Sequence, residues 1–473
     1  MRILLTSLLL AASTVTTAVS VIALPFYDEK SWRSPLVLLT TVLWVLFALS
    51  VFALRRVPLR AAVALVIAGS VAIGGAALAG PPNTSTDSAR YAWDGIVQNA
   101  GVSPYEYVPA DPALRELRTD WLFPAPVIGE NGEPECVGER ILTSNEPGSD
   151  EIICTAINRA KVPTIYPPTS ELFFAGLRFL TGPGPEYWPM QLAGLILSLG
   201  ITGILLRALH TRGRDPRWAA LWGWSPLAAT EGVTNSHIDI LAGLLVLVAT
   251  LLVSNGRRWG GGIALGAAIA VKLIPVIAAP ALLRRQPWKV IVGSIVTFSV
   301  LYVPYILASG IGVLGYLPGY LTEEGYSSGE RFVLLSLVFP GASALVVAAV
   351  LLAVTAGLVW WKTNPDDPWL GQLVMIGATL LIVSPRYPWY ALLLVPIIAM
   401  TGRWEWLAVP VALTARLLVP STDLARAAIA LAIVLILWVS YRRAGPGSVG
   451  RLWGRMLRRL RHPFRSSTAP VQV

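Results

Sequence analysis

The chain has 473 residues, of which 55% are hydrophobic and only 14% are charged, and its mean hydropathy is +0.62. Soluble globular proteins carry roughly 25% charged residues. The composition therefore excludes a soluble protein and indicates a polytopic membrane protein. The net charge of +10 does not indicate a nucleic-acid partner, because arginine is concentrated in the C-terminal tail, where the positive-inside rule explains it.

Three apolar segments open the chain, at residues 3–24, 35–54 and 61–80. Each is close to the ~20 residues that cross a bilayer core as a helix. Basic residues favour the cytoplasmic side, so Arg2 and the basic segment 55–60 predict a cytoplasmic N-terminus. Segment 3–24 is too long for a signal peptide and lacks a clean small-residue cleavage site, so we interpret it as the first span.

A long polar segment follows and is expected on the outer side of the membrane. Residues 81–165 contain thirteen acidic and six basic residues, and they hold the two cysteines of the chain, Cys136 and Cys154. Long loops are usually functional. An even pair of cysteines confined to an extracytoplasmic segment predicts a disulfide, with two free thiols as the alternative.

This external segment begins with a predicted short helix, TDSARYAWDGIVQNAG. Asp87 or Thr86 is placed to cap it, and Gly101 suits its C-terminal end. Arg90 lies four residues before Asp94 and is placed to pair with it. One helix face collects carboxylates and other hydrogen-bonding groups: Asp87, Tyr91, Asp94 and Gln98. Two interpretations remain open, a chemically active surface and an interfacial helix without chemistry.

Aromatic residues accompany these carboxylates. The turn at Tyr166 leads into a second short helix, for which Thr169 or Ser170 is the expected cap. Exposed aromatic rings beside carboxylates suit the C–H face of a sugar, and an interfacial aromatic belt is the alternative. The aromatic sugar-binding candidates are Tyr91, Trp93, Tyr105, Tyr166 and Tyr387.

Apolar segments then continue to residue 440. They lie at 187–206, 218–232, 237–254, 289–309, 341–361, 369–384, 387–401, 404–419 and 424–440. The stretch 260–283 ends in Arg284 and Arg285, which a single crossing would leave on the outer side. We therefore expect a broken pair of short helices that meet near Lys272 and Pro275.

Together these segments predict an all-α polytopic membrane protein, a bundle of about 12–13 transmembrane helices with a large external loop that carries short helices. We expect four parts: a three-span segment at 1–80, an extracytoplasmic catalytic loop at 81–186, a transmembrane bundle at 187–440 and a basic cytoplasmic tail at 441–473. The tail has eight arginines and no acidic residue, so anionic lipids are its expected partner. The sequence shows no inverted repeat of the kind found in many transporters.

Ionisable residues at membrane depth are functional candidates. His237 lies between Asn235 and Asp239 on the expected outer side, and the alternative is a structural histidine with Asp239 as a helix cap. Lys272 and Arg386 are two cations that would suit an anionic phosphate; a snorkelling lysine and a plain loop arginine are the alternatives. Metal-ligand spacings, a P-loop and a dinucleotide fingerprint are missing from the sequence. We expect no cofactor and leave a divalent ion open.

Five strings together resemble a known family: TDSARYAWDGIVQNAGVSPYEYVP, INRAKVPTIYPP, NSHIDILAGLLV, AVKLIPVIAAPALL and SPRYPWYALLLVP. They look like segments of the actinobacterial polyprenyl-phosphate-mannose-dependent mannosyltransferases, integral-membrane enzymes of the GT-C class, most closely those of glycosyltransferase family 87. The resemblance runs from about residue 87 to 396. Three spans precede Asp87 here, whereas the family's base usually follows the first span.

The resemblance implies an inverting transfer of mannose from polyprenyl-phosphate-mannose to a cell-envelope glycan or glycolipid, on the outer face of the plasma membrane. It implies that Asp87 is the general base, with Asp94 as its rival. Lys272 and Arg386 would then bind the leaving phosphate, with Arg90 as a further candidate, and His237, Asn235 and Asp239 would lie near the phosphate or the acceptor. Competing functions are a pentose (arabinose) transferase, a transporter or flippase of a lipid-linked sugar, and a non-catalytic scaffold.

Overall fold

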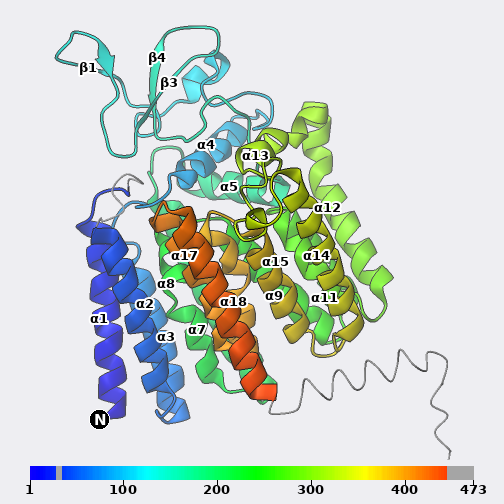
Figure 1. Cartoon of the computed structure of the whole chain (residues 1–473). Helices are drawn as coiled ribbons and strands as arrows, with labels where there is room; N and C mark the ends of the chain where they lie inside the picture. The colour runs from blue at the N-terminus through cyan, green and yellow to red at the C-terminus, as the bar shows by residue number, and fades with distance from the viewer. Residues whose placement is uncertain (28–34, 445–473) are drawn as a thin grey trace, which may run out of the picture.

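The computed structural model describes residues 1–27 and 35–444. The predicted basic tail lies, except for residues 441–444, outside the described residues. Figure 1 shows a bundle of helices with a separate layer of short helices and strands at one end. The start of α1 and the end of α18 lie at the opposite end of the bundle from the strands. The polar segment and the two described chain ends are therefore on opposite sides of the helical layer.

The chain is an all-α polytopic membrane protein, as expected. Among the described residues, seven helical segments are long and apolar enough to cross a membrane. They are α1 (Arg2–Ile22), α2 (Pro35–Leu54), α3 (Leu59–Ala76), α6 (Trp188–Thr211), the stretch Pro287–Glu323 that begins with α12 (Pro287–Ser309), α14 (Ala342–Lys362) and α18 (Thr422–Ala444). A bent pair of helical segments, Pro226–Thr234 and Asp239–Ser254, passes the same criteria when both halves are counted together.

The other helical elements that follow α6 are shorter or interrupted. They are η3 (Pro216–Ala219), α7 (Ala220–Gly223), α8 (Pro226–Ala229), η4 (Thr230–Thr234), α9 (Asp239–Ser254), α10 (Arg258–Ile269), η5 (Ile274–Ala278), α11 (Ala279–Leu282), η6 (Gly310–Leu314), α13 (Leu317–Glu323), η7 (Leu335–Leu337), α15 (Trp369–Val383), η8 (Pro388–Leu393), α16 (Val395–Thr401), η9 (Trp404–Leu407) and α17 (Ala408–Leu418). Proline begins or closely follows the start of several of them, where its fixed φ fits and its missing N–H costs nothing.

The expected break inside segment 260–283 is confirmed. Helix α10 ends at Ile269 and η5 begins at Ile274. The carbonyl of Ala270 accepts a hydrogen bond from the Thr169 N–H (2.8 Å), and the carbonyl of Val271 accepts one from the Ser170 hydroxyl (2.7 Å). A broken helix is tolerated at membrane depth only where its free backbone groups find partners, and here the external loop supplies two of them.

That contact corrects one prediction. Helix α5 (Pro168–Thr181) has Pro167 at its N-cap, and neither Thr169 nor Ser170 caps it. Both residues lie inside the first turn. Their hydrogen-bonding groups serve the neighbouring α10–η5 break instead of the N-terminus of their own helix, a long-range use that the local pattern does not reveal.

The core of the bundle is centred on η8 and α16. Every residue from Pro388 to Met400 is buried. Around this segment pack α6, α7, α9, α15 and α17. A helix that is apolar on all sides belongs inside a large protein or a membrane layer, and here it brings Trp389 and Tyr390 to the centre of the molecule.

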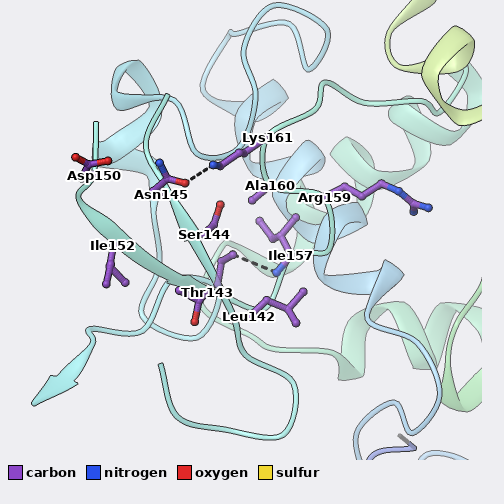
Figure 2. Close-up of a pocket in the computed structure, with 11 residues that line it drawn as sticks. Leu142, Thr143, Ser144, Asn145, Asp150, Ile152, Ile157, Arg159, Ala160 and Lys161 are labelled. Atoms are coloured by element: carbon purple, nitrogen blue, oxygen red, sulfur yellow. Dashed lines mark hydrogen bonds between the residues drawn. The ribbon is translucent and has the colours of Figure 1, made fainter. Parts of the chain in front are cut away.

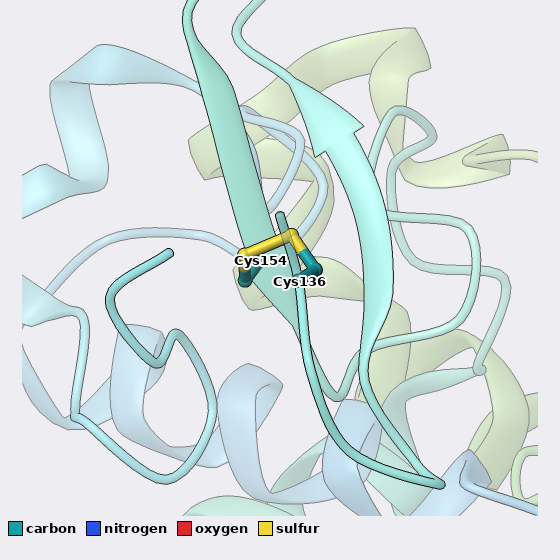
Figure 3. Close-up of a disulfide and its surroundings, with 2 residues drawn as sticks. All are labelled: Cys136 and Cys154. Atoms are coloured by element: carbon teal, nitrogen blue, oxygen red, sulfur yellow. A yellow bond between two sulfur atoms is a disulfide. The ribbon is translucent and has the colours of Figure 1, made fainter. Parts of the chain in front are cut away.

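The external segment contains α4 (Asp87–Asn99), η2 (Pro112–Leu117) and two short antiparallel hairpins, β1 (Val127–Ile128) with β2 (Pro134–Glu135) and β3 (Leu142–Asn145) with β4 (Ile152–Thr155). The sequence predicts short helices in this segment, and the strands were not expected. The predicted disulfide is confirmed: Cys136 is bonded to Cys154, with 5.2 Å between the Cα atoms. Figure 3 shows the disulfide, which joins β4 to the loop between β2 and β3.

Candidate active site

Asp87 is the first residue of α4 and directs its carboxylate toward the helical bundle. Thr86 occupies the N-cap position, so the Asp87 side chain is not used as a cap. Its Oδ1 accepts a hydrogen bond from Asn158 Nδ2 (2.6 Å). Its Oδ2 lies 3.5 Å from His237 Nδ1, and 15% of the side chain is exposed. A carboxylate that is oriented on two sides and still accessible has the properties of a general base.

His237 lies between two carboxylates. Its Nε2 is 3.3 Å from Glu231 Oε2, on the side opposite Asp87, and the imidazole is fully buried. The ring stacks on Trp389, with 3.7 Å between the ring centroids. Stacking on Trp389 thus holds the plane of the imidazole, and each ring nitrogen faces a carboxylate, so Asp87, His237 and Glu231 form a continuous polar row.

The backbone around His237 has an unusual shape that produces this row. Residues 230–234 form a π-helical turn, and Ser236 has a φ of 49°. Single π-turns are frequent at functional sites, and a left-handed serine is a strained conformation that the surrounding structure must maintain. The turn bends the chain by 119° into α9. Glu231 and His237 consequently face each other across the bend, and the His237 N–H donates to the Glu231 carbonyl (2.9 Å).

Asn235 connects the bend to the segment before α4. Its Oδ1 accepts hydrogen bonds from the N–H groups of Asn83 and Thr84, both at 3.1 Å. Its Nδ2 donates to the Thr84 hydroxyl (2.7 Å). Asn235 is fully buried. The structure therefore uses this predicted site residue to position the chain that leads to Asp87.

Lys272 lies in the break between α10 and η5. Its Nζ is 2.8 Å from Asp239 Oδ2, and the Asp239 side chain is fully buried whereas 20% of the lysine side chain is exposed. The same ammonium lies 4.7 Å from the centroid of the Tyr390 ring, and the charge of Asp87 acts on it as well. Asp239 is in the first turn of α9, with Ile238 at the N-cap, so its main role is to pair with Lys272 and not to cap the helix.

Several arginines are arranged beside this lysine. The Tyr390 hydroxyl is 2.7 Å from that of Tyr320. Arg159 lies over the Tyr320 ring at 5.8 Å, and Arg331 lies 5.9 Å from the Tyr390 ring. Each of these arginines is paired with an acid of the α13 region, Arg159 with Glu323 and Arg331 with Glu324. The Tyr320–Tyr390 pair is therefore bordered by cations on both sides.

Arg386 and Tyr387 belong to the same neighbourhood. Tyr387 stacks on Trp389, with 4.4 Å between centroids, and the Arg386 and Arg159 charges both act on it. Arg386 is exposed. Lys272 and Arg386 are thus both next to one aromatic group, formed by Tyr387, Trp389 and Tyr390, of which Trp389 covers His237.

Arg90 and Asp94 form the predicted i, i+4 ion pair, and the structure buries it. Arg90 Nε is 2.7 Å from Asp94 Oδ1, with 6% and 2% of the two side chains exposed. A second guanidinium nitrogen of Arg90 donates to the Val162 carbonyl (3.0 Å). Burial raises the pKa of the Asp94 carboxyl, and the Arg90 charge acts against that shift. The pair joins α4 to segment 162–164, and its members lie three and seven residues after Asp87 along the helix.

A second buried acid extends this pair. Glu171 of α5 accepts hydrogen bonds from the Thr164 hydroxyl (2.7 Å) and from Gln98 Nε2 (2.8 Å). Burial, and then the Asp94 charge, raise the pKa of Glu171 well above its ordinary value of 4.5. Asp94 pairs with Arg90, whereas Glu171 bonds neutral groups, and both carboxyl groups prefer the protonated form more than exposed acids do.

Four aromatic residues proposed as sugar-binding surfaces are buried in the scaffold. Tyr91 stacks on Phe174 with 4.5 Å between centroids, and Trp93 packs against Phe123. The fraction of these residues that is exposed lies between 0% and 9%, for Tyr91, Trp93, Tyr105 and Tyr166. The expectation that they are exposed is wrong, because Trp93 belongs to a separate core of the external segment and Tyr91 and Tyr166 pack into the main core of the bundle. Tyr387 alone among the five candidates is partly exposed.

The part of this site that lies in the helical bundle is similar to a known protein family. Residues 164–385 match the model of glycosyltransferase family 87. The expected resemblance is confirmed. The family match includes Glu231, His237, Asp239 and Lys272, whereas Asp87, Asn158 and Trp389 lie outside it.

Two curated relatives carry the same name, polyprenol-phosphate-mannose-dependent alpha-(1-2)-phosphatidylinositol pentamannoside mannosyltransferase. The Mycolicibacterium smegmatis protein is 24% identical over 268 residues, which are 52% of this chain and 59% of the relative. The Mycobacterium tuberculosis protein is 24% identical over 261 residues, which are 52% of this chain and 57% of the relative. The matched region thus spans somewhat more than half the length of either relative. No solved structure matches the chain.

Three residues of the candidate site were not predicted from the sequence. Glu231 is an acid inside an apolar stretch, and the cost of such a residue at membrane depth was a signal that could have found it. Trp389 resembles the many other tryptophans of the chain. Asn158 lies in a polar loop without any distinguishing pattern. Only the folded chain brings Asn158 within 2.6 Å of Asp87.

The described part of the chain holds no group of three or more His, Cys, Asp or Glu side chains arranged to bind a metal ion. A hollow of roughly 630 Å³ opens in the external segment, between the β3–β4 hairpin and residues 157–161. Figure 2 shows the residues that line it. Asp87, His237 and Lys272 are not among them.

Proposed function

We infer that this protein is an inverting mannosyltransferase that takes mannose from polyprenyl-phosphate-mannose and transfers it to a cell-envelope glycan or glycolipid on the outer face of the membrane. The observation that carries the proposal is the row Asp87–His237–Glu231 beside the Lys272–Asp239 pair, in a chain whose residues 164–385 match glycosyltransferase family 87. The names of the two mycobacterial relatives supply the donor class.

In the proposed reaction an acceptor hydroxyl attacks the anomeric carbon of mannose as the bond from that carbon to the phosphate oxygen breaks. Asp87 accepts the proton of the hydroxyl, and polyprenyl phosphate leaves with the electron pair of the broken bond. A base placed in this way contributes typically ~10²–10⁴-fold. Attack from the face opposite the phosphate converts a β-linked donor into an α-linked product.

His237 acts on Asp87 from the side away from Asn158. It holds the carboxylate in one orientation and carries no step of bond breaking itself. Charge develops on the leaving phosphate, and preorganised cations are most effective at such a position. Lys272, held by Asp239, and Arg386 are the residues we assign to that charge. The exposed part of the Lys272 side chain leaves it accessible to a lipid phosphate.

The test is transfer of labelled mannose by the purified protein in detergent micelles, where a transporter without transferase activity gives no product. We expect Asp87→Asn to reduce transfer at least about 100-fold, with donor binding and folding unchanged. The matched control is Asp120→Asn, which alters an exposed aspartate of the same external segment and should leave transfer intact. Full transfer by Asp87→Asn would remove Asp87 as the base, and donor binding without transfer by the unaltered protein would favour a flippase.

A further inference from the structure

The hollow beside the β3–β4 hairpin has the size of a ligand site. Its volume of roughly 630 Å³ lies within the ~300–1,000 Å³ typical of such pockets. It is lined by residues of both strands of the hairpin, by Asp150 in the connection between them, and by residues of the chain segment 157–161. Figure 2 places Ser144 near the centre of this space, between the side chains of Asn145 and Ile157.

The lining of the hollow suits a hydroxyl-rich ligand. Uncharged hydroxyl and amide groups come from Thr143, Ser144, Asn145 and Thr155, and charged groups of both signs come from Asp150, Arg159 and Lys161. The uncharged groups both donate and accept hydrogen bonds, and the charged groups add donors and acceptors, which is what sugar hydroxyls require. Aliphatic side chains stand between them, and they match the C–H surfaces of a pyranose. Without a continuous apolar wall, the lining does not suit the hydrocarbon chain of a lipid.

The hollow is held in shape before any ligand binds. The disulfide fixes Cys154 of β4, which is paired in register with Thr143 of β3. In the turn that follows β3, the Glu146 carboxylate forms ion pairs with Arg115 (2.8 Å) and Arg118 (2.9 Å). A preformed site loses little free energy to ordering when it binds a ligand.

The same segment that closes the hollow also holds the candidate base. Ile157 and Arg159 line the hollow, and Asn158 between them donates its hydrogen bond to Asp87. Arg159 has a φ of 57° and reaches outward to Glu323 (3.0 Å). This left-handed residue turns the chain, so that neighbouring residues of one short segment face the hollow and the Asp87 site. A ligand in the hollow is therefore separated from the base by the thickness of one chain segment.

We propose that the hollow binds saccharide units of the acceptor glycan, next to the unit whose hydroxyl is presented to Asp87. This proposal rests on the proposed function, because it names the acceptor as a glycan that extends beyond the residue being modified. The hollow then selects for acceptor length and composition, whereas the Lys272 region binds the donor.

The experiment uses the full chain in micelles with an α-linked manno-oligosaccharide as the probe. Saturation-transfer NMR measures binding of the oligosaccharide, and initial rates measure the KM of a mannosylated glycolipid acceptor and of the donor. Ser144→Trp fills the hollow and should raise the acceptor KM at least tenfold, remove the NMR signal and leave the donor KM unchanged. Ile128→Trp, at a highly exposed position on β1 outside the hollow, is the matched control and should match the unaltered protein.

Transfer that proceeds with an unchanged acceptor KM in Ser144→Trp would overturn the proposal while leaving the proposed function standing. Oligosaccharide binding that Ser144→Trp abolishes, in a protein that transfers no mannose, would support the hollow as a glycan site and contradict the proposed function. If Ser144→Trp does not fold, Lys161→Ala removes an exposed lining group and should raise the acceptor KM about fivefold, the value of one hydrogen bond. An unchanged KM in a folded Lys161→Ala would then overturn the proposal.

Discussion

At the scale of single residues, His237 determines how Asp87 is presented. A buried imidazole has two ring nitrogens, and each is directed at a carboxylate. A proton on Nδ1 donates to the Asp87 carboxylate and holds it, whereas a proton on Nε2 is directed to Glu231 and leaves an Nδ1 that can accept the proton Asp87 takes from the acceptor. In the proposed reaction Glu231 is therefore a positioning residue that acts through His237.

Glu231→Gln tests this role with the smallest change of shape. The amide keeps the length of the side chain but no longer bears the charge that orients the imidazole. We expect kcat to fall at least about tenfold, which corresponds to ~1.4 kcal/mol in the barrier, with the donor KM unchanged and the pH profile of kcat displaced. A variant with normal kcat and an unaltered pH profile would show that Glu231 is only a structural residue.

At the scale of elements, the π-helical turn that carries Glu231 is in close contact with α6. A Cβ atom added at Gly194 of α6 would lie 2.2 Å from the Gly232 carbonyl oxygen. That distance is far below any real Cβ contact, so the glycine is needed for the turn to approach. The position of the turn, and through it the position of Glu231 and His237, depends on the absence of one methyl group.

Gly194→Ala should consequently displace the turn and lower transfer at least about tenfold, since small misplacements of catalytic groups are costly. Gly200→Ala is the matched control, because it lies on the same helix and an added Cβ there meets nothing within 4 Å. Both variants gain the same helix propensity. Equal activity of the two variants would contradict the assigned contact.

At the scale of the whole molecule, the buried cluster of Arg90, Asp94 and Glu171 joins the external segment to the bundle. Gln98, which donates a hydrogen bond to Glu171 of this cluster, accepts one from the Tyr305 hydroxyl of α12 (2.7 Å). The carboxyl groups of Asp94 and Glu171 both have raised pKa values for which burial is the main cause. The folded protein therefore binds more protons than the unfolded chain above the ordinary pKa of these acids.

Stability should then fall as pH rises from about 4.5 through the raised pKa of Glu171, because the native state loses protons that it binds more tightly than the unfolded state does. Glu171→Gln removes one of the two acids, so its melting temperature in micelles should depend less steeply on pH across this window. Glu116→Gln, at an exposed position, should retain the slope of the unaltered protein. A slope that Glu171→Gln does not change would assign the pH dependence to other groups.

The sequence predicted the membrane class, α4, the helix break around Lys272, the disulfide and the Arg90–Asp94 pair, because each depends on local spacing or composition. It did not predict the strands of the external segment, the burial of Tyr91 and Trp93, or the roles of Thr169 and Ser170. These depend on which distant surface a residue meets. Asn158 and Glu231 illustrate the limit: each is placed by a neighbour far along the chain, Asn158 by Asp87 and Glu231 by Gly194.

The proposed site is assembled from regions made at very different moments of translation. Asp87 leaves the ribosome early, His237 and Lys272 follow later, and Trp389 comes near the end of the described chain. Until η8 is inserted, the His237 imidazole has no stacking partner, and the surroundings of Asp87 are incomplete. In the proposed mechanism, a ribosome that stalls before η8 would therefore leave in the membrane a product that carries the proposed base and yet transfers no sugar.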